Sequence, residues 1–319
     1  MSLLDEIVFQ PAAMQPISAC ESAMSTLVSF GPHGSLRPLQ AQAPWMVCHT
    51  TPEQAGTKWV DLCSRLNARG LLIECSVPAL EKVPVNTIPR RLFRQSIHLP
   101  IDVENVHSAD LIEITCQSPI TSIWGWPPEI ESSSNLPAWL NSVRQVIGGQ
   151  TPLGIGVSDG VDDNAIRAIL ACKVDFITLH SRGNIEFLVN TLVRIRKAIE
   201  ASSISTSVCV RTKISSMEQL LKVVALGANA ITVDGLLSEI WQSSNSSMSS
   251  FLGTRLPAGI AAPAAPCPIA EKLDKLQTSL QQTLQLTGCS SVQALRGSLR
   301  AVSPSAAQLA CLPLIGMDS

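Results

Sequence analysis

The sequence contains no tyrosine and little charge. Among its 319 residues, aromatic residues make up 4% and charged residues 15%, whereas soluble domains usually contain about 25% charged residues. Lysine and arginine total 23 and aspartate and glutamate total 25, which gives a net charge of −2. Binding to nucleic-acid phosphates needs a clear basic excess, so we expect no nucleic-acid partner. The low charge instead indicates large buried faces, and we expect a partner that is another protein chain or a second copy of this one.

Long apolar runs and a signal peptide are also missing. No uninterrupted apolar segment reaches the roughly 18 residues of a membrane-spanning helix. Asp5 and Glu6 stand where a signal peptide has lysine or arginine. We therefore expect a cytoplasmic protein without membrane contact, whose ten cysteines are reduced. None of the cysteines forms a C-x-x-C pair, so their spacing predicts neither a zinc ribbon nor a ferredoxin-type cluster.

Eight short apolar segments alternate with stretches of helical periodicity. The segments cover residues 45–49, 71–75, 92–95, 111–115, 152–157, 175–179, 206–210 and 229–233. Continuous apolar strands separated by helices are typical of a parallel sheet that is covered on both faces. Eight such units predict a closed α/β barrel of the (β/α)8 TIM type, and a doubly wound open sheet is the alternative.

The rest of the chain is predicted to extend this barrel. We assign residues 1–241 to the barrel with an N-terminal extension, and residues 242–268 to a Ser-rich loop and a Pro/Ala linker. Residues 269–319 are predicted to form C-terminal helices packed on the barrel. The first of these helices carries apolar residues at helical spacing on one face, namely Ile269, Leu273, Leu276, Leu280 and Leu284.

Six segments resemble the FMN-binding domain of glutamate synthase, in the same order along the chain. They are Asp5–Ala12, Pro44–Thr51, Ser108–Ile114, Pro152–Ile155, Val224–Ala230 and Thr287–Leu295. The resemblance implies an FMN-binding (β/α)8 barrel with an iron–sulfur cluster, which reduces 2-iminoglutarate to glutamate.

Several positions depart from the pattern of that family. Two lysines that would face the flavin are replaced by Thr115 and Gly156, and the glycine-rich motif of the sixth strand is reduced to Gly183 after His180. The positions near the flavin phosphate are Arg211, Thr212, Lys213, Asp234 and Gly235. A carboxylate at Asp234 would repel a phosphate. Only Cys267 is left of the cluster ligands, whereas a cluster needs about four.

From these departures we expect no iron–sulfur cluster and no cofactor. The main hypothesis is therefore a flavin-free pseudoenzyme that acts as a partner or regulatory subunit. The alternative is an active FMN-dependent oxidoreductase of the glutamate synthase type, in which Arg211 and Lys213 would bind the flavin phosphate.

A third hypothesis is a repurposed enzyme without flavin. The predicted carboxyl ends of the strands carry residues suited to catalysis, which are Cys48, His49, Glu74, Cys75, Cys116 and His180. Such side chains could form an open zinc site or a thiolate activated by imidazole. We assign no metal ligands, because alternate residues of a strand face different layers and the sequence does not show which of them meet.

Overall fold

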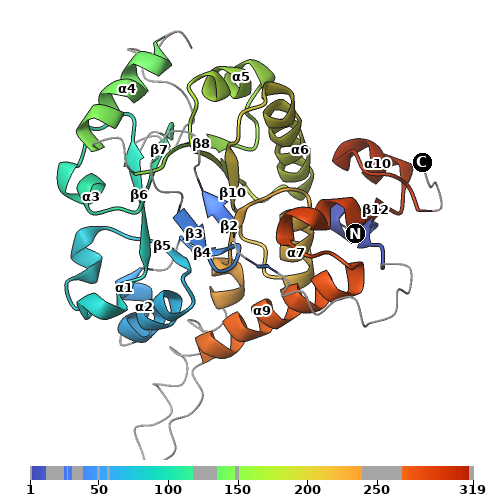
Figure 1. The fold of residues 1–319 in the computed structure, drawn as a ribbon, viewed down its shortest axis with the longest axis horizontal. Coiled ribbons are helices and arrows are strands. Elements are labelled where there is room, and N and C mark those ends of the chain that lie inside the picture. Colours follow the sequence, from blue (N-terminus) through green and yellow to red (C-terminus); the bar gives the residue numbers. More distant parts are fainter. Residues whose placement is uncertain are drawn as a thin grey trace, which may run out of the picture.

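Eight parallel strands close into a barrel in the computed structural model (Figure 1), which describes residues 2–11, 25–26, 28–30, 39–48, 51–55, 58–117, 135–147, 151–238 and 268–315. The order around the barrel is β10-β11-β4-β5-β6-β7-β8-β9, and β9 pairs with β10 to close it. The (β/α)8 barrel predicted from the sequence is confirmed, and each predicted apolar segment contains one strand. The strands are β4 (Trp45–Val47), β5 (Leu72–Glu74), β6 (Arg90–Ser96), β7 (Leu111–Thr115), β8 (Leu153–Ser158), β9 (Phe176–His180), β10 (Ser207–Arg211) and β11 (Ala230–Thr232).

Strand β6 is longer than its apolar segment predicted. It begins at Arg90 because the charged start of the strand finds partners on its neighbours. The backbone N–H of Arg91 donates to the Asp110 carboxylate at 2.7 Å, and its buried guanidinium donates to the Asn105 carbonyl at 2.6 Å. A buried arginine is tolerated only with such partners.

Helices cover the barrel, and several begin at side-chain caps. Asp162, Asn184 and Ser216 each accept a hydrogen bond from a backbone N–H in the first turn of the helix that follows. Such caps satisfy N–H groups that have no partner within the helix. The helices are α1 (Pro52–Ala55), α2 (Trp59–Ala68), α3 (Val103–His107), α4 (Leu136–Ile147), α5 (Asp163–Ala171), α6 (Ile185–Ser202) and α7 (Met217–Ala225), with 3-10 turns η4 (Val77–Leu80) and η5 (Val85–Thr87).

The two ends of the chain meet on the outside of the barrel (Figure 1). After the 3-10 turn η1 (Leu3–Glu6), strand β1 (Ile7–Phe9) pairs antiparallel with β12 (Leu299–Ala301). The C-terminal segment also contains α9 (Pro268–Thr287), the 3-10 helix η7 (Val292–Ser298) and α10 (Pro304–Ala310). The predicted apolar face of α9 is at most 1% exposed and belongs to the same core as the barrel.

A hairpin closes the N-terminal end of the barrel. Strands β2 (Val28–Phe30) and β3 (Leu39–Ala41) pair antiparallel, and their apolar side chains join the residues inside the strand starts in one cluster. Phe176 fills this interior. A Cβ at Gly154 would lie 2.3 Å from its ring, so only glycine leaves room for the phenyl group.

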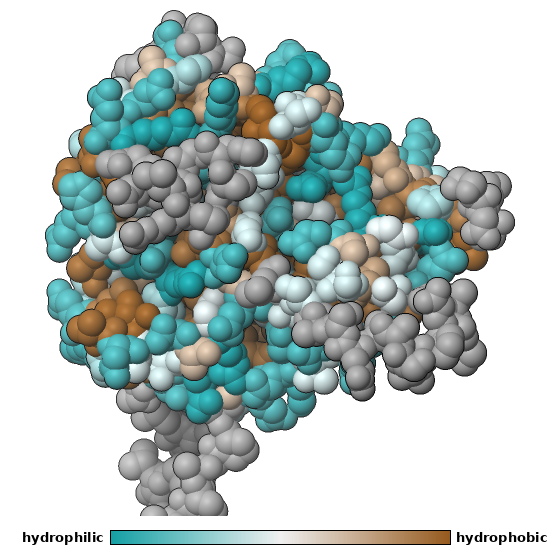
Figure 2. Space-filling view, in the orientation of Figure 1, coloured by the Kyte–Doolittle hydropathy of each residue, from teal (hydrophilic) through white to brown (hydrophobic). Residues whose placement is uncertain are grey.

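The described surface mixes hydrophilic residues with small groups of hydrophobic ones. On the face in Figure 2 the hydrophobic groups are separated by hydrophilic residues. Phe187, Leu286 and Val85 are the most exposed large hydrophobic side chains of the described residues. None of the described helices is long and apolar enough to span a membrane. The protein partner expected from the low charge stays a prediction.

Candidate functional site

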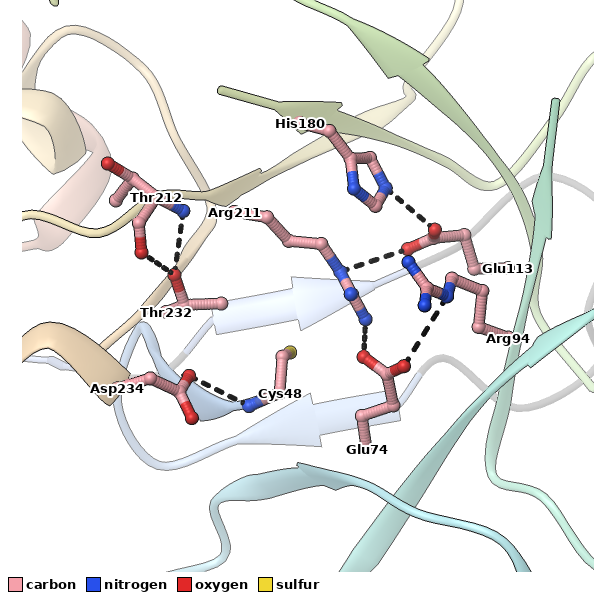
Figure 3. Close-up of polar contacts among 9 residues, drawn as sticks. All are labelled: Cys48, Glu74, Arg94, Glu113, His180, Arg211, Thr212, Thr232 and Asp234. Carbon is pink, nitrogen blue, oxygen red and sulfur yellow. Dashed lines mark hydrogen bonds and ion pairs between the residues drawn. The ribbon is translucent and has the colours of Figure 1, made fainter. Parts of the chain in front are cut away.

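Ionisable side chains from five strands meet inside the carboxyl end of the barrel (Figure 3). They are Glu74 of β5, Arg94 of β6, Glu113 of β7, His180 of β9 and Arg211 of β10. Parallel strands bring their carboxyl ends to the same mouth, which is the catalytic face of (β/α)8 barrels. We call these five residues the mouth network.

A buried pair of Glu113 and His180 forms one half of the network. Its Nε2–Oε1 distance is 2.8 Å, and the Glu113 side chain is fully buried. Burial alone raises the pKa of the Glu113 carboxyl, but the charges of His180 and Arg94 and hydrogen bonds from His180 and Thr178 lower it overall. Glu113 is therefore an ionised carboxylate inside the barrel.

Gly156 makes room for this pair. A Cβ at this position would lie 2.7 Å from Glu113 Oε1 and 2.9 Å from His180 Nε2. The glycine that replaces the lysine of the glutamate synthase pattern is thus the neighbour that the buried pair requires.

Arg211 lies between two carboxylates in the other half of the network. Its side chain is 2% exposed; its Nη2 forms an ion pair with Glu74, and its Nε lies 3.6 Å from Glu113 Oε2. Arg94 Nε lies 3.5 Å from Glu74 Oε1. Within the part of the chain that the structure describes, Arg211 Nη1 is buried and makes no hydrogen bond. A buried donor without an acceptor is costly, and a ligand with acceptor atoms would relieve that cost.

The loops after β10 and β11 lie tightly against each other. Thr212 N–H donates to Thr232 Oγ1 at 2.8 Å, and that hydroxyl donates to the Thr212 carbonyl at 2.9 Å (Figure 3). A Cβ at Gly235 would lie 2.3 Å from the carbonyl oxygen of Ile214, so the two backbones can approach only at glycine. The side chain of Lys213 is exposed beside them. Barrels of this type often bind phosphate groups at these two loops.

The Asp234 carboxylate is engaged with the first barrel strand. It accepts a hydrogen bond from the backbone N–H of Cys48 at 2.9 Å. This contact ties the end of β11 to the end of β4, so the carboxylate has a structural partner that the sequence alone did not show.

The cysteines at the strand ends are neutral thiols. Burial raises the pKa of Cys48, Cys75 and Cys116 to about 12 in each case. Cys75 and Cys116 also belong to the apolar core cluster. Thr115 is buried, and its hydroxyl accepts from the Gln117 N–H at 3.2 Å. His49 and Cys267 lie outside the described residues, and among those described no three His, Cys, Asp or Glu side chains gather as a metal site.

The structure thus brings together three of the residues singled out from the sequence, Glu74, His180 and Arg211. It adds Arg94 and Glu113, which the sequence analysis missed. For Glu113 the signal was an ionisable residue within an otherwise apolar strand, Leu-Ile-Glu-Ile-Thr at 111–115. Such a residue needs a buried partner.

A cavity of about 900 Å³ opens beside the network. Its walls come from the ends of β4, β5 and β6 and from α2, and they include Cys48, Glu74, Arg94, Trp59 and Phe93. Small-molecule sites usually have volumes of about 300–1,000 Å³ and combine apolar walls with a few polar groups.

Comparisons with known proteins identify the fold. No protein-family model and no curated protein matches the chain. Among solved structures, a flavocytochrome b2 variant with benzoylformate has a TM-score of 0.62 at 12% identity, over 99% of this chain and 80% of that chain. A mandelate oxidase variant with the C4a-OH-FMN adduct has a TM-score of 0.60 at 15% identity, over 93% and 88%. Another mandelate oxidase structure, with a monooxide FMN adduct, has a TM-score of 0.57 at 16% identity.

These comparisons support one expectation from the sequence in part and correct another. This chain shares the barrel fold of solved structures that include FMN-holding proteins. None of the structures compared above is a glutamate synthase, so they do not favour that family over others with the same barrel. The expectation of a barrel without cofactor is contradicted, because mandelate oxidase structures of the same fold hold FMN adducts. That expectation depended on lysines missing at Thr115 and Gly156. Any strand end can bring positive charge to the mouth, and here Arg94 and Arg211 do so. The chain shares its barrel fold with FMN-dependent oxidoreductases.

Proposed function

We propose that this protein is an FMN-dependent oxidoreductase. The observation that carries the proposal is the buried network around Arg211, which lies at the mouth of a barrel whose structural relatives include FMN-holding oxidases. The resemblance to glutamate synthase adds 2-iminoglutarate as one candidate substrate, and the similarity in fold to mandelate oxidase adds 2-hydroxy acids such as mandelate as a second class.

The mouth of the barrel matches a flavin in the charge of its residues and in the size of the cavity beside them. Arg211 offers a buried positive charge and N–H donors without an acceptor, which suits the electron-rich edge of the ring. The cavity beside Glu74 and Arg94 has room for a planar ring system. Lys213, whose side chain is exposed beside Asp234 and Gly235, would hold the phosphate. FMN, when bound, supplies a ring that accepts two electrons from one substrate and passes them to another.

The chain's own residues supply a route for a proton. Because the Glu113 carboxylate can only accept, the short contact at 2.8 Å places a proton on His180 Nε2. The imidazole is then oriented by Glu113, as carboxylates orient histidine bases in other enzymes. His180, held in this way by Glu113, is the residue of the mouth network to which we assign proton transfer during turnover.

Flavin binding tests the proposal directly. The purified protein is titrated with FMN, and binding is followed by flavin fluorescence and by the visible spectrum. We expect saturable binding at one FMN per chain. Arg211→Met should weaken it at least tenfold, and Arg211→Lys should weaken it less because the charge is kept. Arg167→Met, which removes an exposed arginine on α5, is the matched control and should bind as the wild type does.

The reaction is tested on the flavin-loaded protein. Anaerobic mixing with 2-hydroxy acids such as mandelate should bleach the flavin if they are the substrates. Alternatively, 2-iminoglutarate should reoxidise the flavin after chemical reduction. A wild-type protein that binds no FMN at millimolar concentration would overturn the proposal.

A further inference from the structure

Two arginines meet at the opposite end of the barrel from the mouth network. Arg196 of α6 and Arg296 of η7 line a small cavity together with Val28, Asn229 and Gln293. Val28 belongs to the hairpin that closes the N-terminal end of the barrel, and Asn229 directly precedes β11. The cavity is therefore separate from the candidate flavin site.

Arg196 forms no ion pair of its own in the described part of the chain. Its Nε is buried without a hydrogen bond, and no hydrogen bond or ion pair of the described residues includes its guanidinium. The nearby carboxylate of Glu200 is 56% exposed and forms its ion pair with Arg296, at 2.8 Å. Two guanidinium groups thus share one carboxylate, which leaves an excess positive charge at the cavity.

The surroundings of Arg196 act against its positive charge. Burial lowers the pKa of its guanidinium, and the charge of Arg296 lowers that pKa further, while Glu200 raises it. Like charges held this close destabilise each other unless an anion lies between them. An anion in the cavity would remove both the repulsion and the unsatisfied donor.

The backbone places Arg196 at this point. Gly227 has a φ of +116°, which favours glycine, and it follows the end of α7. A Cβ there would lie 2.9 Å from Arg196 Cγ and 3.0 Å from its Nε. The side chain of Arg196 therefore lies across the bare backbone of the turn between α7 and β11, and its position depends on that glycine.

The cavity matches a small anion in size. Its volume is about 50 Å³, and one water needs about 10–15 Å³ on this measure. A few waters or one phosphate or carboxylate group would fill it, whereas a nucleotide would not. Asn229 Oδ1 accepts from the Val208 N–H at 2.8 Å, so its amide NH2 stays available as a further donor.

We propose that this cavity is a binding site for a small oxyanion, held by Arg196 and Arg296. Arginine suits such a ligand because its planar fork of N–H groups matches the oxygens of phosphate and carboxylate. We expect phosphate to bind better than acetate, since its greater charge meets two guanidinium groups.

Calorimetric titration of the full chain with inorganic phosphate tests the site, at constant ionic strength in chloride buffer. We expect saturable binding that weakens at least tenfold in Arg196→Met. Arg194→Met removes the same charge from the same helix, where Arg194 pairs with Asp163 at the surface, and should leave binding unchanged. If Arg196→Met does not fold, Arg196→Gln and the thermal shift caused by phosphate replace it.

The outcomes separate this site from the flavin site. Acetate that competes with phosphate supports the oxyanion assignment and identifies carboxylates as ligands. Loss of phosphate binding in Arg211→Met but not in Arg196→Met would place the anion at the mouth and overturn the proposal. Absence of saturable binding of either anion would overturn it as well, whether or not the protein binds FMN.

Discussion

The substitution Glu113→Gln removes one negative charge from the mouth network and keeps the volume of the side chain. Glu113 is fully buried, 2.8 Å from His180 Nε2 and 3.6 Å from Arg211 Nε. After the change, Arg94 and Arg211 share the single carboxylate of Glu74. Removing one partner of a buried ion pair costs about 3–5 kcal/mol, because the remaining charge is left uncompensated.

That cost translates into a measurable shift of the melting temperature. With an unfolding entropy of about 2.1 cal/mol/K per residue, a chain of 319 residues should melt about 4–8 °C lower. Calorimetry or circular dichroism of the two proteins measures the shift. Glu271→Gln, which removes an exposed carboxylate on α9, is the control and should leave the melting temperature unchanged.

The pH dependence of the difference provides a second readout. The pKa of Glu113 is lowered from its ordinary value of 4.5, so its contribution to stability is complete above pH 4.5 and is lost as the pH falls through the lowered pKa. The difference in melting temperature between the wild type and Glu113→Gln should therefore be largest at pH 7 and should become smaller below pH 4.5. A variant that melts at or above the wild-type temperature at pH 7 would refute the reasoning.

Three further substitutions or reactions test other parts of the structure. Gly156→Ala places a methyl group 2.7 Å from the Glu113 carboxylate. Thermal unfolding should show that the free energy of unfolding falls by about 1–3 kcal/mol. An unchanged free energy would mean that the site is looser than described. A thiol reagent at pH 7 should label the exposed Cys311 long before Cys48, whose pKa is raised to about 12. Peptide mass spectrometry measures the labelling rate of each cysteine, and equal rates would contradict the burial of Cys48. Leu280→Ala on the fully buried face of α9 should cost about 2–5 kcal/mol in denaturant unfolding, whereas a negligible cost would show that α9 is not part of the common core.

Residue patterns predicted the helical and strand segments better than the exact ends of the elements. Ser215 and Glu218 have the spacing of a capping box, but the cap is Ser216, which accepts the hydrogen bond from Gln219 N–H. Thr51 and Pro52 have the pattern of a helix start and Gly70 that of a helix end, yet the segment between them contains two helices, α1 and α2. The position of a helix cap, or of an interruption between two helices, depends on local backbone geometry that the spacing of apolar residues does not specify.

The mouth network could be predicted only in part. His180 and Glu74 stand at strand ends, where a barrel places its reactive groups, so the sequence indicated them. Glu113 lies in the middle of a strand, and its role becomes visible only when β7 and β9 are placed on either side of β8. The interpretation of Gly156 as a lost lysine was incomplete for the same reason, since Glu113 and His180 beside it come from the two strands that flank β8.

The sequence by itself determined a parallel α/β sheet, because eight apolar segments separated by amphipathic helices can be buried together only in a parallel sheet that is covered on both faces. That this sheet closes into a barrel instead of staying open was decided by the tertiary structure. The sequence also determined the buried face of α9 through its helical spacing. Only the tertiary structure decided which charges meet. Glu113 and His180 are 67 residues apart in the chain, and the pairing of β7 and β9 on either side of β8 brings them to hydrogen-bonding distance. Closure of the barrel, rather than any local preference, then brings Glu74 of β5 to Arg211 of β10.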